Sequence, residues 1–207
     1  MSTAHLSDRV NGMATSATLA MAAKARELKN AGKDIIGLSL GEPDFNIPDF
    51  IKEAAKQAID DNYSSYSPVD GYADLKEAIV EKFSRDNGLH YESNQIVVST
   101  GAKQSLANVA MVMLNKGDEV ILPAPYWVSY SDIVKLAEGV PVEVPTSIDA
   151  DFKMTAAQLE AAITPKTKMI WFSSPCNPSG SVYSAEELES LAVVLRKHPN
   201  IYVVSDE

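Results

Sequence analysis

The residues best suited to chemistry follow short apolar runs that read as buried strands. Asp206 follows the run Ile201–Val204, with Ser205 between them, so we expect its carboxylate at the mouth of an apolar strand, well buried. A buried carboxylate requires a cation or several hydrogen-bond donors, and a protonated pyridine nitrogen is a partner of this kind. The alternative is an aspartate that caps a helix N-terminus, and the residue alone leaves both interpretations open.

Asn177 follows a second run of this type, Met169–Phe172, in the segment SSPCNPSG. Prolines on both sides restrict its backbone, so that its side-chain amide could donate to a ligand oxygen. A plain Asn-Pro turn is the alternative. The neighbouring Cys176 suggests a nucleophile, but none of the histidines has a placement that suggests a general base. We therefore favour Asn177 over Cys176 as a functional residue.

Two further segments could hold a ligand. Gly101, Ala102 and Lys103 form a small-residue turn before a predicted helix, where backbone N–H groups and the helix dipole attract phosphate. A tight strand–helix turn is the commoner alternative. Trp127 lies in PAPYWVSY, whose aromatics and prolines could form a wall for a flat ring or simply pack in the core. Neither the dinucleotide-binding nor the P-loop glycine motif occurs in the sequence.

These segments need a scaffold that brings strand ends together. Short apolar runs, most of them separated by helical patterns, predict an α/β protein with a mostly parallel sheet covered on both faces. Ligands of such sheets bind beyond the carboxyl ends of the strands. The predicted strands are Ile35–Leu40, Ile96–Ser99, Glu119–Leu122, Val142–Val144, Met169–Phe172 and Ile201–Val204, and the predicted helices are Ser16–Asn30, one starting at Asp49, Ala73–Asn87 and one after a Ser184/Glu187 capping box.

The composition argues against several classes of protein. Among 207 residues, 18 basic side chains stand against 28 acidic ones, which gives a net charge of −10. Because so acidic a chain repels phosphate backbones, we do not expect nucleic acid as a partner. No apolar run approaches the roughly 18 residues of a membrane span, and the N-terminus lacks the apolar stretch of a signal peptide. The single cysteine fits a reducing compartment, so we expect a cytoplasmic protein without membrane contact.

Six sequence blocks, taken in order, resemble the class I aminotransferases of pyridoxal-phosphate (PLP) fold type I. They are GEPDF at 41–45, SYSPVDG at 65–71, STGAKQS at 99–105, PAPYWVSY at 123–130, SSPCNPSG at 173–180 and VSDE at 204–207. The similarity runs the length of the chain and is greatest to the bacterial aspartate and prephenate aminotransferases. It implies the large domain of that fold, a mostly parallel sheet between helices, and pyridoxal 5'-phosphate as the cofactor.

The resemblance implies how the ring of the cofactor would be held. Trp127 would stack on the pyridine ring, and Asp206 would pair with the pyridine nitrogen. Asn177 would bond the ring hydroxyl oxygen and help hold the α-carboxylate of the substrate. Trp127 would also contact the substrate. The sequence departs mildly from the family at Ala102, where glycine is commoner, and at Cys176, where asparagine or serine is commoner.

The resemblance also implies phosphate and substrate contacts. The backbone at Gly101, Ala102 and Lys103 would hold the cofactor phosphate. Lys103 would also help bind the distal carboxylate of the substrate, as a lysine does in the aspartate subgroup, and the backbone of Gly41 would approach the substrate. Tyr66 matches a tyrosine that reaches the phosphate of the neighbouring subunit, which implies a homodimer.

Other functional groups are expected beyond Glu207. They include the lysine that binds the cofactor, an arginine for the substrate carboxylate and most of the small domain, so we interpret the chain as part of a longer polypeptide with no catalytic residue of its own. Residues 1–45 would form an N-terminal arm and part of the small domain. Residues 46–207 would form the N-terminal part of the large domain, which is incomplete at its C-terminus.

The expected activity is the transfer of an amino group from an aspartate-like amino acid to a 2-oxo acid. Since a fold does not fix a reaction type, β-elimination or racemisation on the same scaffold is one alternative. A second alternative is a non-catalytic binding module, such as a regulator's domain or a remnant that binds the cofactor without turnover.

Overall fold

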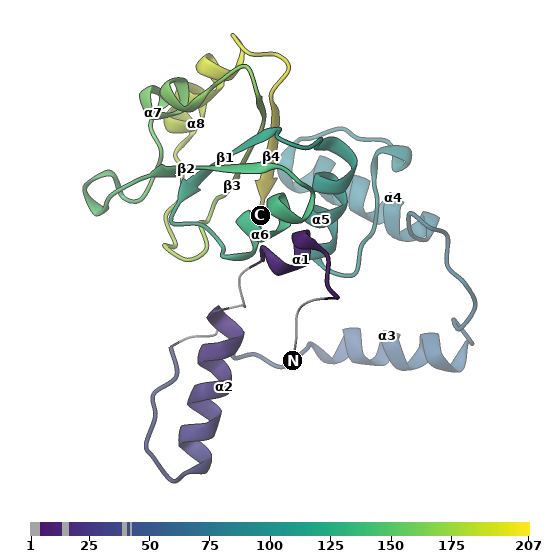
Figure 1. The fold of residues 1–207 in the computed structure, drawn as a ribbon. Coiled ribbons are helices and arrows are strands. Elements are labelled where there is room, and N and C mark those ends of the chain that lie inside the picture. The colour runs from purple at the N-terminus through teal and green to yellow at the C-terminus, as the bar shows by residue number, and fades with distance from the viewer. Residues whose placement is uncertain (1–4, 14–16, 39–40, 42) are drawn as a thin grey trace. The chain divides into compact units, whose positions relative to one another are not determined.

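The computed structural model describes residues 5–13, 17–38, 41 and 43–207. The chain divides into two compact units, one made of residues 1–20 and 102–207 (unit 1) and the other of residues 21–101 (unit 2). Figure 1 shows the helices and strands of each unit. The predicted division at residue 45 concerns the domains of a longer protein and stays a prediction.

Unit 1 is built on a parallel four-stranded sheet (Figure 1). The strands are β1 (Glu119–Ala124), β2 (Val140–Pro145), β3 (Thr167–Ser173) and β4 (Tyr202–Asp206), arranged in the order β2-β1-β3-β4. Every pairing between neighbouring strands is parallel. The last four strand predictions are therefore confirmed, and so is the predicted α/β class with a parallel sheet.

Side chains of the central strands alternate between two hydrophobic cores, one on each face of the sheet. Val120 and Leu122 of β1 join the first core, whereas Ile121 joins the second, and all three are inaccessible to solvent. Helices α5 (Ala102–Met113) and α6 (Ser129–Leu136) supply the first core. Helices α7 (Ala156–Ala162) and α8 (Ala185–Leu195) supply the second. Burial on both faces explains why these strands read as continuous apolar runs.

The outer strand β4 is less buried than the central strands. It pairs with β3, and Tyr202 and Val203 are each 50% exposed. Because β4 lies at the edge of the sheet within the described part of the chain, its carboxyl end is more open than the sequence predicts.

The cap predicted at the start of α8 is present. Ser184 Oγ accepts a hydrogen bond from Glu187 N at 3.2 Å, and Glu187 Oε2 accepts one from Ser184 N at 2.7 Å. A reciprocal pair of this kind satisfies two N–H groups that the helix cannot pair internally.

The helix predictions hold, whereas two strand predictions fail. The helices of the first half are α1 (Asp8–Asn11), α2 (Ala17–Asn30), α3 (Asp49–Asp60) and α4 (Ala73–Lys82), and α4 continues as the π-helical turn Phe83–Asn87.

Within the described chain, no helix is both long and apolar enough to cross a membrane.

The predicted strand at Ile96–Ser99 is wrong. These residues follow the 3-10 turn Ser93–Gln95 and do not pair with a strand. Val98 N instead donates a hydrogen bond to the carbonyl oxygen of Asp70, in a loop. The predicted strand at 35–40 is also absent over residues 35–38, and Ser39 and Leu40 lie outside the described residues. An apolar run becomes a strand only when a second strand pairs with it.

Leu159 tests the second core, because its side chain is fully buried on α7. Leu159→Ala should lower the free energy of unfolding by about 3 kcal/mol, through lost burial and a residual cavity. Leu188→Ala on α8 is the matched control: Leu188 is 38% exposed, so its loss should stay below about 1 kcal/mol. Urea unfolding followed by circular dichroism measures both, and equal losses would contradict this assignment of the core.

Candidate functional site

The carboxyl edge of the sheet brings together three of the predicted site residues. Trp127 follows β1, Asn177 follows β3, and Asp206 is the last residue of β4. Because the strands are parallel, these three positions come from the same edge of one sheet. The α5 helix, which begins at Ala102 and includes Lys103, packs in the same unit.

Asp206 is held by a buried tyrosine. Tyr130 Oη donates a hydrogen bond of 2.6 Å to Asp206 Oδ2, although Tyr130 lies on α6, far from Asp206 in the sequence. Tyr130 is only 1% exposed, so its hydroxyl requires a partner. Asp206 is partly buried, which corrects the prediction that it is well buried: β4 lies at the sheet edge and does not enclose its own carboxyl end.

An aromatic cluster fixes the ring of Tyr130. Its ring stacks with that of Tyr126 at a centroid distance of 6.2 Å and meets Trp127 and Trp171 edge-on, at 5.7 and 5.8 Å. Edge-to-face and offset-stacked pairs of this type are favourable beyond the area that they bury. The cluster therefore orients the hydroxyl toward Asp206. Burial, followed by the hydrogen bond to Asp206, raises the pKa of Tyr130, which keeps the phenol a neutral donor.

Tyr130 is a site residue that the sequence does not predict. It stands four residues after Tyr126 in PAPYWVSY, the spacing at which two side chains share one face of a helical turn. That spacing is typical of core residues, and it gives no indication of a polar contact with a strand far along the chain.

Lys103 lies against Trp127. The Lys103 ammonium is 4.7 Å from the centroid of the Trp127 ring, within the range of a cation–π interaction, which contributes about 0.5–2 kcal/mol. The structure thus brings together two residues that the resemblance placed at the ligand. It also puts a positive charge beside the aromatic wall, where an anionic group of a ligand could bind.

The loop that carries Asn177 is closed by its own backbone. Cys176 N donates to Ser181 O at 2.9 Å, and Gly180 N donates back to Cys176 O at 2.7 Å. Asn177 N donates to Ser173 Oγ at 3.2 Å, while the Asn177 residue as a whole is exposed. A fixed backbone with an exposed amide is the arrangement that a ligand contact requires.

Cys176 has a structural contact in this loop. Its thiol lies 3.5 Å from the carbonyl oxygen of Pro125, to which it donates. This contact links the loop after β3 to the segment after β1, and it supports the preference for Asn177 over Cys176 as the functional residue.

The remaining predicted residues lie at the start of α5 and in unit 2. Ala102 and Lys103 open α5, and the first N–H groups of a helix have no partner inside it. Gly101, Gly41 and Tyr66 belong to unit 2. Gly101 has a φ of 84°, a conformation that suits glycine, and Gly41 and Tyr66 are exposed. The roles expected of these three residues stay predictions.

The parallel sheet and the residues that follow its strands are typical of one class of protein, and comparison with known families identifies that class. The family model described as aminotransferase class I and II matches residues 33–207, and the chain belongs to this family.

Within this family, the chain is similar to proteins named aspartate/prephenate or aspartate aminotransferase. The chain is 53% identical over 204 residues to the aspartate/prephenate aminotransferase of Cereibacter sphaeroides, covering 99% of this chain and 51% of the relative. It is 53% identical over 202 residues to that of Nitrosomonas europaea, covering 98% and 51%. The solved aspartate aminotransferase from Thermus thermophilus with maleate has a TM-score of 0.94 at 46% identity, over 98% of this chain and 53% of that one. The chain thus spans about half the length of the relatives it matches, and its fold is that of the aspartate aminotransferases.

The Tyr130–Asp206 contact predicts a pH dependence of stability. Because the pKa of Tyr130 is raised above the value of about 10 for an unfolded tyrosine, the unfolded state releases this proton first as the pH rises. Above about pH 10, titration of Tyr130 therefore lowers the unfolding free energy of the unsubstituted protein by up to about 1.4 kcal/mol per pH unit. The Tyr130→Phe variant lacks this loss.

The measurement is the difference in unfolding free energy between the parent and Tyr130→Phe. It should stay constant between about pH 7 and pH 9, where the phenol is protonated in both states, and shrink above about pH 10. A difference that does not change with pH would contradict the raised pKa.

Proposed function

We propose that the full-length protein uses pyridoxal phosphate to transfer an amino group from an aspartate-like amino acid to a 2-oxo acid. The observation that carries this proposal is the Asp206 carboxylate, held by Tyr130 at the carboxyl edge of the sheet. The names of the relatives, aspartate/prephenate and aspartate aminotransferase, support the same activity.

The chemistry of the residues present fits this cofactor. Pyridoxal phosphate is a flat ring that bears a basic nitrogen, a hydroxyl and a phosphate. The site offers a carboxylate at Asp206, an indole at Trp127 and an exposed amide at Asn177, together with an ammonium at Lys103 beside a helix N-terminus. Each part of the cofactor therefore has a complementary group among these residues.

Each residue would have a defined task. Asp206 would keep a proton on the ring nitrogen, because an ion pair favours the charged form, and Tyr130 would orient that carboxylate. Trp127 would stack on the ring, and Asn177 would donate to the ring hydroxyl oxygen and to the substrate carboxylate. With its nitrogen protonated, the bound cofactor acts as an electron sink for the bonds at the substrate α-carbon.

Several parts of the proposal depend on groups outside the site in unit 1. The lysine that binds the cofactor is expected beyond Glu207, and Tyr66 and Gly41 would contribute as the resemblance implies. We also propose that the protein acts as a homodimer, which the resemblance at Tyr66 implies, and that it lies in the cytoplasm, which the single cysteine of the chain supports.

The direct test is an assay of the purified full-length protein with pyridoxal phosphate, aspartate and 2-oxoglutarate. We expect glutamate to form and the cofactor to remain bound through gel filtration. Asp206→Asn should lower kcat by about 100-fold or more, because it removes the anionic partner of the ring nitrogen.

Other products would point to other functions. Release of ammonia from an amino acid, without a new amino acid, would indicate elimination. Bound cofactor without turnover of any amino-acid pair would indicate a binding module. Either result would overturn the proposed transfer.

Lys103 provides a separate test of substrate class. If its ammonium binds the distal carboxylate, Lys103→Met should raise KM about tenfold or more for aspartate, but less than about twofold for alanine, which has no such group. Lys116→Met is the matched control, because Lys116 is exposed in the loop after α5. A similar rise for both donors would show that Lys103 does not select dicarboxylic substrates.

A further inference from the structure

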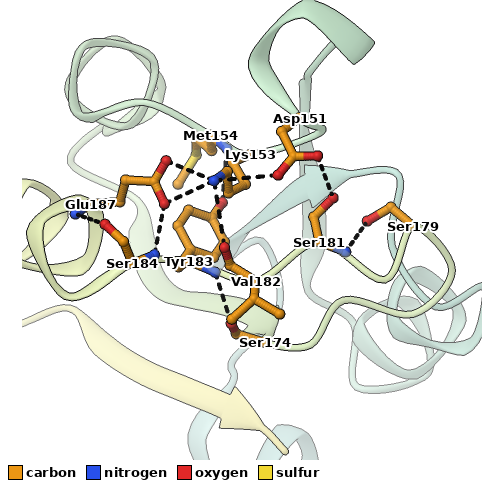
Figure 2. Close-up of polar contacts among 10 residues, drawn as sticks. All are labelled: Asp151, Lys153, Met154, Ser174, Ser179, Ser181, Val182, Tyr183, Ser184 and Glu187. Atoms are coloured by element: carbon orange, nitrogen blue, oxygen red, sulfur yellow. Dashed lines mark hydrogen bonds and ion pairs between the residues drawn. The ribbon is translucent and has the colours of Figure 1, made fainter.

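A lysine outside the candidate site connects three segments of unit 1. Lys153 Nζ lies 2.8 Å from Glu187 Oε1 and 3.4 Å from Asp151 Oδ2, and it donates to Val182 O at 3.4 Å (Figure 2). Its side chain is only 17% exposed. A partly buried ammonium is stabilised by acceptors of this kind, and the turn before α7, the loop before α8 and the first turn of α8 all contribute one to the same charge.

Tyr183 attaches the same turn to the start of the Asn177 loop. The Tyr183 hydroxyl accepts a hydrogen bond of 2.7 Å from Met154 N, next to Lys153, and Tyr183 N donates to Ser174 Oγ at 3.0 Å. Tyr183 is 8% exposed, and its ring meets that of Phe172 in β3 edge-on. The first residue of the loop after β3 is therefore fixed relative to the turn at 151–154.

Asp151 attaches the turn to the other end of the loop. Ser181 Oγ donates to Asp151 Oδ1 at 3.4 Å (Figure 2), and Ser181 O accepts from Cys176 N. Asn177 thus lies in a loop whose two ends, Ser174 and Ser181, are both held by the turn that carries Lys153. Figure 2 shows both attachments converging on this turn.

A small pocket lies between the loop and the turn that carries Lys153. A cavity of about 10 Å³ is lined by Lys153, Cys176 and Tyr183 among other residues, which is room for about one water molecule. The turn and the loop therefore line this pocket together, the turn through Lys153 and the loop through Cys176.

Charge makes Lys153 the central member of the cluster. Its ammonium lies between the carboxylates of Asp151 and Glu187. The hydrogen bond between Lys153 and Glu187 lowers the pKa of Glu187 and raises the pKa of Lys153. Without the ammonium, the two carboxylates would repel each other. Asp151 holds Ser181, and Glu187 Oε2 accepts from Ser184 N, next to Tyr183. The repulsion would therefore act on both ends of the loop.

We propose that Lys153 is a positioning residue, which fixes the Asn177 loop through Asp151 at one end and through Glu187 and Tyr183 at the other. It touches neither substrate nor cofactor in this role. The inference rests on the proposed function for the task of Asn177, but the attachment of the loop is independent of that function.

The test uses the full-length protein with Lys153→Met, which keeps the length of the side chain and removes its charge. Hydrogen exchange of the peptide 174–182 should become faster, and the Kd for pyridoxal phosphate and the KM for aspartate should rise about tenfold. Lys153→Arg restores the charge and should bring both constants back to within about threefold of the parent. Lys197→Met is the matched control, because Lys197 forms an exposed pair with Glu160 and should leave all three measurements unchanged.

A double-mutant cycle separates positioning from general stabilisation. In an Asn177→Ala background, Lys153→Met should raise KM by less than about twofold, because the side chain that it positions is already absent. Equal effects in both backgrounds would overturn the proposal, as would unchanged exchange of the loop. If Lys153→Met does not fold, Ser181→Ala, which removes only one attachment, must speed exchange of the same peptide; unchanged exchange would overturn the proposal.

The outcomes distinguish this inference from the proposed function. Faster exchange in Lys153→Met with no cofactor binding by the parent would uphold the attachment and reject the pyridoxal-phosphate enzyme. If the unsubstituted protein binds the cofactor and transfers the amino group, but Lys153→Met leaves hydrogen exchange of the loop unchanged, the proposed function would stand and the attachment by Lys153 would be rejected.

Discussion

The parallel pairing of β1, β2, β3 and β4 is the constraint on which the rest of the structure depends. Since each strand must run in the same direction as its neighbour, the chain returns through a helix or a long connection each time. Every carboxyl end then lies at one edge, and the segments after those ends meet there although they are distant in sequence. The aromatic cluster, the Asn177 loop and Asp206 are neighbours for this reason.

Features that depend on local sequence were predictable. The central strands β1 and β3 bury both faces, and such strands appear as short apolar runs whatever their order in the sheet. The Ser184/Glu187 cap is also local, because both partners lie in one turn of helix. The run at 96–99 has the same apolar character, but no strand pairs with it among the described residues. Strand propensity indicates how well a segment suits a sheet, and does not indicate whether a partner strand is available.

Contacts between distant segments were not predictable in the same way. Asp206 was recognised from its place after an apolar strand, but its partner Tyr130 and its partial exposure depend on the order of strands in the sheet. Lys153 reads in the sequence as one more surface lysine, since most lysines are exposed. Its partial burial results from contacts with segments that are distant from it in the sequence, so no spacing in the sequence indicates it.

Because the partner of Asp206 is a phenol, the charge of this partner does not change when the acidity of the surroundings changes. Buried among aromatic rings, with its pKa raised, the Tyr130 hydroxyl keeps the same charge throughout the range of acidity that a cell experiences. The field that it exerts on Asp206 is therefore constant, like that of a permanent dipole. A protein built in this way carries no proton-driven switch at this position, and any sensitivity of its turnover to acidity would have to arise from groups elsewhere.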